Sequence, residues 1–559
     1  MLQTKALEEK LAKQRKVAEE ADAKRRAEAL KLPYLDLISV KVPTEIKAMQ
    51  LVPEAEAKEA LLVPIQLARK KLIVAAFNPE KPEAKAILER LKKTYTVETV
   101  VSSLSSLTHG WSYYKYVAAE EKEISGRVQI DHARLGDLMG QMKNLEDVKR
   151  AIAEFKSPLT SEMLEIVIAG AMALRASDIN LEPREGGGTL RYRIDGLLYI
   201  AYDGFAAHVY HSLVTRVKLL SNLKLNVADE PQDGRFTIDL EDRDIEVRTS
   251  LIPSEYGETS VMRILDPNAL KVNLEDLGWR ADDLAIVQGE IKKPNGLVLN
   301  TGPTGSGKTT TLYAFLKHVW KPEIKVITVE DPIEYHLQGI SQTQVDPEAN
   351  YTFASGLRAI LRQDPNIILV GEIRDKETAE IALNASLTGH IVFSTLHTND
   401  AVGAVPRLLD LGIQPQILGP SLTLIIAQRL VRILCKHCRV PSPLGKEDAE
   451  RIKKLLAELP ARVDRTPYAK PTVFQPKGCA ECKNLGYHGR TSIFELFAIT
   501  KEIEEMIYKN PTEIDLARLA REGGMTTMQE DGTLKVLQGI TSFDEVERVT
   551  GPLLWRGAK

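Results

Sequence analysis

The chain has little cysteine, no long apolar run and almost no net charge. No stretch approaches the roughly 18 consecutive apolar residues that a membrane-spanning helix needs. The first residues, MLQTKALEEKLAKQRK, are charged and contain no apolar core of the kind that a secretory signal has. The formal net charge of −3 does not favour a nucleic-acid-binding protein. We therefore expect a cytoplasmic protein that reaches the inner face of a membrane only through its partners.

The few cysteines form two pairs, CKHC and CAEC, each with the spacing C-x₂-C. Two such pairs can make a tetrahedral thiolate site for Zn²⁺, whereas disulfides are uncommon in a cytosolic chain. The forty residues between the pairs contain a helical pattern, KEDAERIKKLLAEL, so we expect a small helical insert to bring the pairs together. Two unrelated pairs are the alternative, and nearby His437 and His488 are expected to be bystanders. The predicted zinc ligands are Cys435, Cys438, Cys479 and Cys482.

The segment TGPTGSGKTTTLYAF, from Thr301 to Phe315, fits the phosphate-loop pattern G-x-x-x-x-G-K-[ST]. An apolar run before it predicts a buried strand and an apolar run after it predicts a helix, which is the context that the pattern requires. Glycines let backbone N–H groups turn toward phosphate oxygens, and the helix N-terminus adds positive potential. We expect Lys308 to reach the β- and γ-phosphates of ATP and Thr309 to bind Mg²⁺; a chance glycine-rich turn is the alternative. The predicted nucleotide-binding residues are Gly302, Pro303, Thr304, Gly305, Ser306, Gly307, Lys308, Thr309 and Thr310.

Two later apolar runs end in carboxylates. In IILVGEIRD, residues 367–375, Glu372 fits the end of a Walker B strand, where a carboxylate can hold Mg²⁺ and orient the attacking water. The run KVITVEDPIE, residues 325–334, is a second strand with acids at its end. Because strand ends of a parallel sheet meet at the ligand crevice, we predict that these acids also serve the metal and the phosphates; ordering of the following turn is the alternative. They are Glu330, Asp331 and Glu334.

A third apolar run, in TGHIVFSTLHTND, has a histidine on either side of it, His390 and His397. His397 follows the run, at the edge where the carboxylates are expected. We predict that His397 senses or contacts the γ-phosphate, with a structural histidine as the alternative.

Changes of pattern divide the chain into expected parts. Residues 1–32 are rich in Ala, Glu and Lys and predict a charged helix, interpreted as a solvated extension; docking to a partner or a membrane surface is the alternative. The other parts are a small α/β domain at 33–115, a linker at 116–156, an α/β domain with an antiparallel sheet at 157–270 and a parallel α/β domain at 271–559 that carries the zinc insert at about 434–484 and a helical tail.

Four of these stretches, in this order, resemble the ATPase superfamily of type IV pilus assembly and type II secretion, of the PilB/GspE type. They are GPTGSGKTT, TVEDPIEY, LVGEIRD and TGHIVFSTLHTND. The tetracysteine insert is similar to the family too, and so are several shorter stretches: GLRAILRQDPN, ASDINLEP, RYRIDG, PQDGRF and RTSLIPSEYGETSVMRIL. The resemblance covers roughly residues 157–559 strongly and residues 33–115 less specifically. Asn180 stands where the family usually has histidine.

The resemblance implies an α/β multidomain fold, in which a PAS-like domain precedes a RecA-like P-loop ATPase core with a tetracysteine zinc insert. It implies a hexamer, with ATP between the two domains and Glu372 as the catalytic glutamate. Arg248 and Arg263 match the arginine fingers of the family, and guanidinium groups suit the spreading of phosphate charge. Without the resemblance, both would be read as surface arginines of strands.

The implied function is that of a cytoplasmic homohexameric motor, which hydrolyses ATP to assemble pilins into a type IV pilus. Its implied partners are an inner-membrane platform protein of the PilC/GspF type and, as a further candidate, a cytoplasmic pilus alignment protein. A type II secretion or DNA-uptake motor is the alternative. A nucleic-acid translocase is less favoured, because the pI is about 6.4 and no basic, aromatic-lined stretch is present; no nucleic-acid partner is expected. A scaffold without catalysis is disfavoured by Lys308, Glu372 and the two arginines. Some relatives bind cyclic di-GMP, but ARLGDL at Ala133 lies in the wrong place for that motif, so this ligand is not expected.

Overall fold

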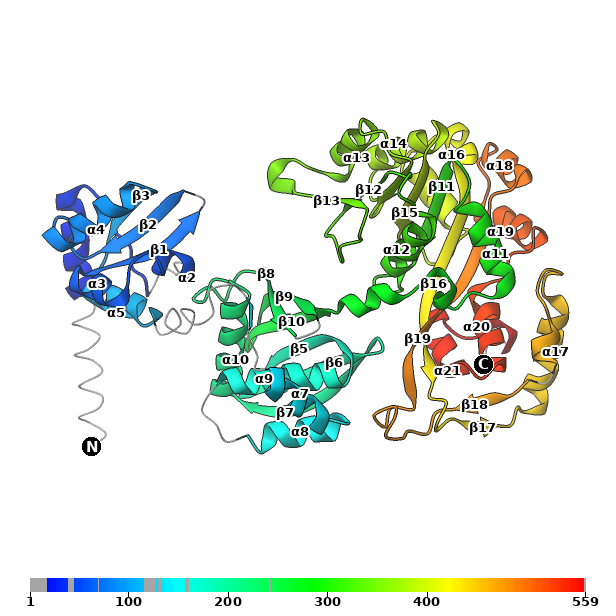
Figure 1. Cartoon of the computed structure of the whole chain (residues 1–559), viewed down its shortest axis with the longest axis horizontal. Helices are drawn as coiled ribbons and strands as arrows, with labels where there is room; N and C mark the ends of the chain where they lie inside the picture. Colours follow the sequence, from blue (N-terminus) through cyan, green and yellow to red (C-terminus); the bar gives the residue numbers. More distant parts are fainter. Residues whose placement is uncertain are drawn as a thin grey trace. The chain divides into compact units, whose positions relative to one another are not determined.

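The structure is a computed structural model that describes residues 18–38, 45–68, 70–114, 127–128, 132–155, 160–240, 243–469 and 471–556. The chain divides into two compact units, Met1–Asp266 and Pro267–Lys559 (Figure 1), which are described separately. Among the described residues, no helix combines the length and the apolar content that crossing a bilayer requires.

The first unit begins with a small α/β domain around a three-stranded sheet. The strands lie in the order β1-β2-β3, with β1 antiparallel and β3 parallel to β2. The apolar sequences of β1 and β2 are buried on both faces and form the core with α4. The elements are α2 (Ile46–Met49), α3 (Glu54–Glu59), β1 (Leu62–Ala68), β2 (Lys71–Ala76), α4 (Pro82–Lys92), β3 (Thr96–Val101) and α5 (Leu104–Trp111).

The helix expected near the N-terminus is present over residues 18–30, but it is not a solvated extension. Ala23 and Ala27 are buried, and the Glu20 carboxylate accepts hydrogen bonds from the hydroxyls of Tyr34 and Ser103, each at 2.5 Å. The sequence pattern suggested exposure because the apolar stripe is made of alanine, whose small side chain allows close packing. Residues 1–17 of the expected helix lie outside the described residues.

The second domain of the first unit is built on a seven-stranded sheet in the order β4-β8-β9-β10-β5-β6-β7. All neighbouring strands are antiparallel except β4 and β8, which are parallel. The elements are β4 (Arg127–Val128), α7 (His132–Gln141), α8 (Leu145–Ala153), α9 (Thr160–Ala173), β5 (Ala176–Arg184), β6 (Gly187–Ile194), β7 (Leu197–Ala206), α10 (Ala207–Leu220), β8 (Gln232–Asp239), β9 (Asp244–Ser254) and β10 (Gly257–Leu265).

The described part of the expected linker, 116–156, packs on this second domain. Strand β4 pairs with β8, and α7 and α8 both pack against α9. Val148 and Ile152 on α8 are buried, and a Cβ added at Gly170 on α9 would lie 3.0 Å from Val148. The sequence showed the helical pattern but not where its apolar face would be covered.

The second unit is organised by a seven-stranded sheet in the order β13-β12-β14-β15-β11-β16-β19. Six of these seven strands run parallel to one another, and the seventh, β19, runs antiparallel to β16. The strands are β11 (Gly296–Thr301), β12 (Val326–Glu330), β13 (Ser341–Gln344), β14 (Ile367–Val370), β15 (Ile391–Leu396), β16 (Leu422–Leu434) and β19 (Tyr487–Ala498).

Helices cover both faces of this sheet, which is why its central strands are continuous apolar runs. In β14, Ile368 and Val370 join one core with α13, α14, α15 and α16, whereas Ile367 and Leu369 join the other core with α11 and α12. The helices are α11 (Ala281–Glu290), α12 (Lys308–Val319), α13 (Phe353–Leu361), α14 (Lys376–Leu387), α15 (Ala404–Asp410), α16 (Pro415–Ser421), α18 (Lys501–Ile507), α19 (Glu513–Glu522), α20 (Met528–Leu537) and α21 (Phe543–Thr550).

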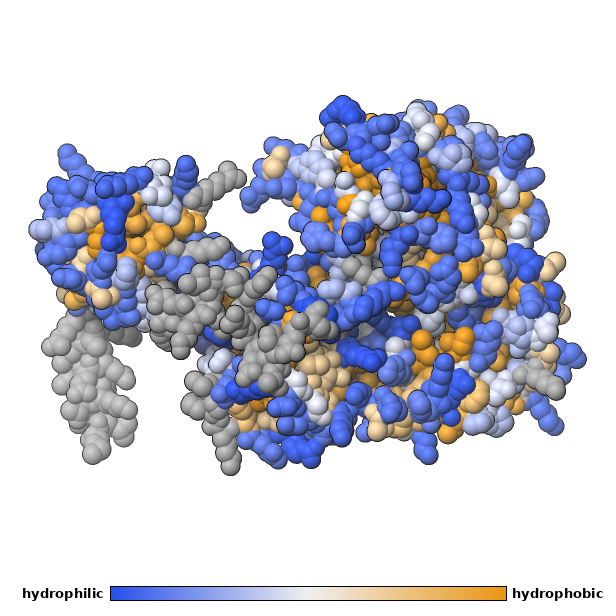
Figure 2. Space-filling model, viewed as in Figure 1, coloured by the Kyte–Doolittle hydropathy of each residue, from blue (hydrophilic) through white to orange (hydrophobic). Residues whose placement is uncertain are grey.

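Over the residues that the structure describes, the remaining elements are a small excursion and five short 3₁₀ helices. The excursion holds α17 (Lys446–Glu458) and a two-stranded antiparallel ribbon of β17 (Val440–Ser442) and β18 (Val473–Gln475). The face shown in Figure 2 is largely hydrophilic over the described residues, so apolar side chains gather mainly in the cores. The 3₁₀ helices are η1 (Pro267–Lys271), η2 (Leu274–Leu277), η3 (Pro347–Ala349), η4 (Thr466–Tyr468) and η5 (Leu554–Arg556).

Candidate functional site

The glycine loop joins β11 to α12 at the carboxyl edge of the parallel sheet. Gly302, Gly305 and Gly307 have φ angles of 149°, 79° and 93°, a region that favours glycine. A Cβ would also collide at two of these positions: at Gly302 it would lie 2.6 Å from the carbonyl oxygen of Gln428, and at Gly307 it would lie 2.8 Å from Nε2 of Gln428. The glycines are therefore required both by the backbone conformation and by what lies beneath the loop.

The loop keeps polar groups that a phosphate can use. The ammonium group of Lys308 donates to the carbonyl oxygens of Gly302 at 2.7 Å and Pro303 at 3.1 Å, and burial lowers the pKa of Lys308 to about 8. The hydroxyl of Ser306 is buried and has no hydrogen-bond partner among the described residues. Pro303, Thr309 and Thr310 are exposed. This arrangement fits a nucleoside triphosphate, whose oxygens would accept from Ser306 and Lys308.

Glu372 follows β14, two strands away from β11, and contacts two basic side chains. Its carboxylate lies 2.5 Å from Nη2 of Arg374 and 3.4 Å from Nε2 of His397. The hydrogen bond to Glu372 raises the pKa of Arg374. The Glu372 side chain is largely buried, whereas half of the His397 side chain is exposed.

Local hydrogen bonds explain why these side chains converge. Asp375 caps the N-terminus of α14 by accepting from the N–H of Thr378 at 2.8 Å, so the chain turns directly after Glu372. The N–H of Thr398 donates to the hydroxyl of Thr301 at 2.9 Å, which ties the residue after His397 to the start of the glycine loop. His390, at the opposite end of β15, contacts the carbonyl oxygen of Ala385 instead.

The acids after β12 have three different environments. Glu330 is buried, and its carboxylate accepts from Thr328 at 2.5 Å, from Gln342 at 3.0 Å and from the hydroxyl of Tyr313. These bonds use the carboxylate to fasten α12 and β13 to β12, which favours a structural role for Glu330. Asp331 is exposed and Glu334 is half-buried, so both remain candidates for contact with a metal or with water.

In the first unit, Arg248 and Arg263 stand opposite each other on β9 and β10. These two arginines belong to a row of residues that lie opposite one another on neighbouring strands, called here the arginine row. Arg235 on β8 continues the row on one side, and Asp178 on β5 and Arg193 on β6 continue it on the other. Residues in register share one face of a sheet. Buried Asp178 pairs with Arg263 at 3.0 Å and with Arg193 at 3.3 Å, and Arg248 pairs with Glu246 of its own strand at 3.1 Å, so carboxylates neutralise part of the positive charge of the row.

The four cysteines meet in one cluster, with all Sγ atoms within 4.8 Å of one another. Three of the Sγ–Sγ distances are 3.8 Å, and four sulfurs placed ~2.3 Å from a central Zn²⁺ would stand about 3.8 Å apart. Backbone N–H groups of Gly478, Cys479 and Gly486 point at the sulfurs of Cys438 and Cys482. The cluster therefore fits a tetrahedral zinc ion.

The long gap between the cysteine pairs is closed by more than the predicted helix. Strands β17 and β18 pair directly after Cys438 and directly before Cys479, so the ribbon returns the chain to its starting point. Helix α17 packs in one apolar cluster with α20 and α21. Both strands have only three residues, and β17 contains Pro441, so no recognisable strand pattern marks the ribbon in the sequence.

Comparison with known proteins shows the family. A family model described as type II/IV secretion system protein matches residues 154–548, which is more than half of the chain. The chain belongs to the type II/IV secretion system protein family. A model described as MshEN domain matches residues 30–120.

Curated members of the type II/IV secretion system protein family are similar over most of their length. Type II secretion system protein E of Pseudomonas aeruginosa is 43% identical over 421 residues, covering 75% of this chain and 80% of that protein. HxcR of the same organism is 40% identical over 512 residues, covering 90% and 99%. Type II secretion system ATPase E of Vibrio cholerae is 38% identical over 513 residues, covering 89% and 99%.

The structure of the ATPase DotB from Legionella pneumophila has a TM-score of 0.51 at 20% identity, covering 71% of this chain and 98% of that chain, and shows a shared fold. The expected fold class, with a RecA-like ATPase core, is confirmed. As a member of the type II/IV secretion system protein family, with its glycine loop and Glu372 on one sheet, the chain is an ATP hydrolase.

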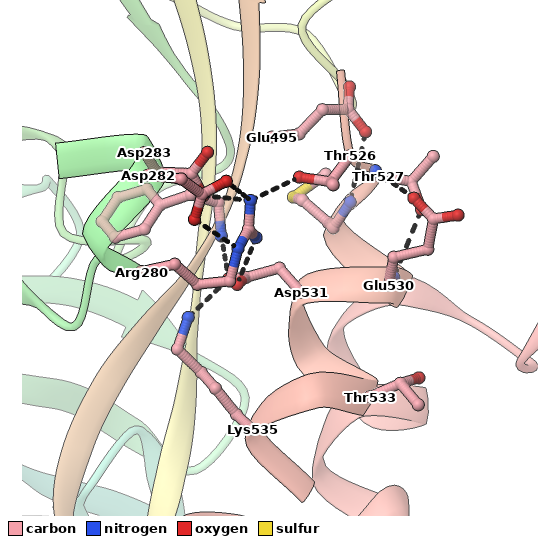
Figure 3. A network of polar contacts seen from close by, with 12 residues as sticks. Arg280, Asp282, Asp283, Glu495, Thr526, Thr527, Glu530, Asp531, Thr533 and Lys535 are labelled. Carbon is pink, nitrogen blue, oxygen red and sulfur yellow. Dashed lines mark hydrogen bonds and ion pairs between the residues drawn. The ribbon is translucent and has the colours of Figure 1, made fainter. Parts of the chain in front are cut away.

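Several polar residues around the site escaped the sequence reasoning. Arg374 lies inside the quoted Walker B stretch, and Arg235 inside PQDGRF, but neither had a spacing that marked it. Glu495 is buried on β19 (Figure 3). Its carboxylate accepts from the N–H of Ala401 at 2.9 Å and of Met528 at 3.3 Å. A single carboxylate within the apolar end of a strand, IFELFA, is a usable signal, because such a group must have partners.

Proposed function

We propose that this chain is the motor ATPase of a type II secretion system, working as a homohexamer on the cytoplasmic side of the inner membrane. The observation that carries the proposal is the meeting of the glycine loop and the Glu372–His397 pair at one edge of a parallel sheet. The choice of machine is supported by the names of the similar proteins, which are type II secretion proteins. They do not favour type IV pilus assembly, the machine expected from the sequence, which stays the second candidate.

In the proposed reaction, the glycine loop holds ATP by its backbone N–H groups and by Lys308 and Ser306. Lys308 leaves the carbonyl oxygens of Gly302 and Pro303 and donates to the phosphates. A partly buried ammonium group without an anion costs free energy, and the phosphate oxygens remove that cost. Thr309 and Glu372 would hold Mg²⁺, which supplies neutralisation of the phosphate charge. The exposed Thr304 and Thr310 are proposed as further contacts of the nucleotide.

Glu372 is the proposed base that orients and deprotonates the attacking water. Its contacts with Arg374 and His397 hold the carboxylate in one position. His397 is proposed to contact the γ-phosphate, because it is exposed and adjacent to the carboxylate. Arg248 and Arg263 are the proposed arginines that spread the charge of the transferring phosphoryl group.

The proposed partners are further copies of this chain, an inner-membrane platform protein and, for the pilus alternative, a cytoplasmic pilus alignment protein. Hydrolysis would move the platform protein and so drive pilin-like subunits into a fibre. Zn²⁺ held by the four cysteines is proposed to have a structural role.

The test is affinity capture of Glu372→Gln protein from native membranes, with mass spectrometry of the captured proteins. We expect the variant to keep its nucleotide and to retain the platform protein of a type II secretion system. Recovery of a pilus platform protein and pilins would move the function to pilus assembly with the same chemistry. Recovery of DNA-bound proteins instead would contradict the secretion proposal.

A further inference from the structure

One buried glutamine lies in the longest strand of the ATPase sheet. Strand β16 reads LTLIIAQRLVRIL, and Gln428 lies in its middle with 1% of its surface exposed. An amide buried in such a position costs free energy unless its polar atoms find partners. The contacts of Gln428 therefore indicate why the strand contains it.

Every polar atom of the Gln428 side chain is used. Oε1 accepts from Nδ2 of Asn300 at 2.8 Å and from the hydroxyl of Thr311 at 2.9 Å, and Nε2 donates to the hydroxyl of Ser492 at 2.9 Å. Asn300 is the next-to-last residue of β11, the strand that precedes the glycine loop, and Thr311 lies in the first turn of α12, the helix that follows it. One amide oxygen therefore joins both stems of the loop, while Ser492 holds the amide from β19.

Gln428 also lies directly beneath the loop. Its carbonyl oxygen and its Nε2 are the atoms that a Cβ at Gly302 or Gly307 would meet. The same carbonyl oxygen accepts from Arg429 at 3.0 Å, and Arg429 donates with its other Nη to the carbonyl oxygen of Asn399 at 2.7 Å. Asn399 lies two residues after His397, so the support reaches both sides of the predicted phosphate site.

We propose that Gln428 is a positioning residue, which fixes the glycine loop in the conformation that binds and transfers phosphate. A loop with three glycines in the left-handed region is costly to order, because glycine loses more conformational freedom than other residues. The paired hydrogen bonds to Asn300 and Thr311 hold the two ends of this loop at a fixed separation. The inference rests on the proposed ATP hydrolysis and adds the group that aligns its binding site.

The test uses Thr311→Val, which keeps the shape of the side chain but loses the hydroxyl, and Thr311→Ser, which keeps the hydroxyl. Gln428→Met removes the whole set of hydrogen bonds at similar volume. We expect Thr311→Val and Gln428→Met to weaken the affinity for a non-hydrolysable ATP analogue and to lower kcat/KM by about 10- to 100-fold, because small misplacements of reacting groups are costly. The affinity for the analogue and the kcat/KM of Thr311→Ser should stay close to those of the wild type.

A double-mutant cycle makes the test specific. The effects of Gln428→Met and Thr311→Val should be far from additive, since both remove the same hydrogen bond. Thr533→Val is the matched control: Thr533 is also a buried helical threonine (Figure 3), but its hydroxyl donates to the carbonyl oxygen of Gln529 and accepts from Nε1 of Trp555, and neither partner belongs to the glycine loop. It should leave kcat/KM unchanged.

The outcomes separate this inference from the proposed function. If the wild type hydrolyses ATP and Thr311→Val does so with unchanged kcat/KM and affinity, Gln428 only fills the strand and the inference is overturned. Equal losses in Thr311→Ser and Thr311→Val would overturn it too. If the wild type itself hydrolyses no ATP, the proposed function fails first. The threonine variants keep the test decisive even if Gln428→Met does not fold.

Discussion

At the scale of single residues, Glu495 is a buried carboxylate whose charge depends on pH near neutrality. Burial, together with the nearby Asp400, raises the pKa of Glu495 from its ordinary 4.5 to about 7, although Arg429 and the N–H groups of Ala401 and Met528 act in the opposite direction. A raised pKa in the folded state means that the protein holds this proton more firmly than the unfolded chain does. Its contribution to stability is complete below about pH 4.5 and is lost as the pH rises through about 7.

We predict that the stability of the Glu495→Gln variant, compared with that of the wild type, increases as the pH rises from 5 to 8. The variant is neutral throughout, whereas the wild type must bury a charge above pH 7, at a cost on the order of 3 kcal/mol, since one pKa unit is ~1.4 kcal/mol. The measurement is the Tm difference between the two proteins at each pH. A difference that stays constant, or that grows in favour of the wild type at high pH, would rule the account out.

The arginine row predicts a loss of catalysis without a loss of the nucleotide. Arg248→Ala and Arg263→Ala should each lower kcat by roughly 10³-fold while an ATP analogue still binds, because arginine acts mainly on the transition state. Arg184→Ala is the control: Arg184 is exposed on β5 and pairs with Asp203, outside the row, and its loss should leave kcat unchanged. If both variants keep the kcat of the wild type, Arg248 and Arg263 have no role in catalysis and are ordinary surface residues of their strands.

At the scale of elements, buried charges fasten α20 to the ATPase sheet. Arg280, just before α11, lies 2.8 Å from the buried Asp531 on α20 and 2.7 Å from the buried Asp283 (Figure 3). Asp531 also pairs with Lys535 and accepts from the N–H of Phe494 on β19. This network links the start of the unit to its C-terminal helices.

Arg280→Met should destabilise the protein by about 3–5 kcal/mol, because it removes a buried cation that the buried carboxylates of Asp283 and Asp531 share. Arg451→Met, which removes an exposed pair with Glu447 on α17, should change stability by less than about 1 kcal/mol. Chemical unfolding followed by tryptophan fluorescence compares the two. Similar small losses for both variants would mean that the network contributes little.

The cysteine cluster predicts one zinc ion per chain with a local structural role. Cys435→Ser and Cys482→Ser should lose the metal and make the excursion of α17, β17 and β18 sensitive to protease, since structural zinc sites contribute folding free energy. His437→Ala should keep the metal. Elemental analysis measures the zinc content, and limited proteolysis measures the protease sensitivity. If both cysteine variants keep their full zinc content, the four cysteines are not the zinc site.

The sequence predicted the elements whose pattern is local and missed the contacts that depend on packing. The loop, its flanking strand and helix, and the apolar runs before Glu330, Glu372 and His397 all had recognisable patterns, because parallel strands buried on both faces are continuously apolar. The burial of Glu330 by Tyr313 and Gln342, and the pairing of β17 with β18, depend on residues distant in the chain. No local pattern contains that information.

At the scale of the whole molecule, the residues proposed for the reaction are divided between the two compact units: the glycine loop and Glu372 belong to Pro267–Lys559, and the arginine row belongs to Met1–Asp266. A motor built in this way should hydrolyse ATP only as the intact chain in its oligomer.

The most direct test of the central claim is Mg²⁺-dependent phosphate release from ATP by the purified full chain, compared with its Glu372→Gln variant. The account predicts that the wild type releases phosphate and that the variant does so at least about 10²-fold more slowly, as expected for loss of a general base, while binding an ATP analogue with similar affinity. Equal rates of phosphate release in the two proteins would contradict the assignment of Glu372 and, with it, the mechanism proposed for this motor.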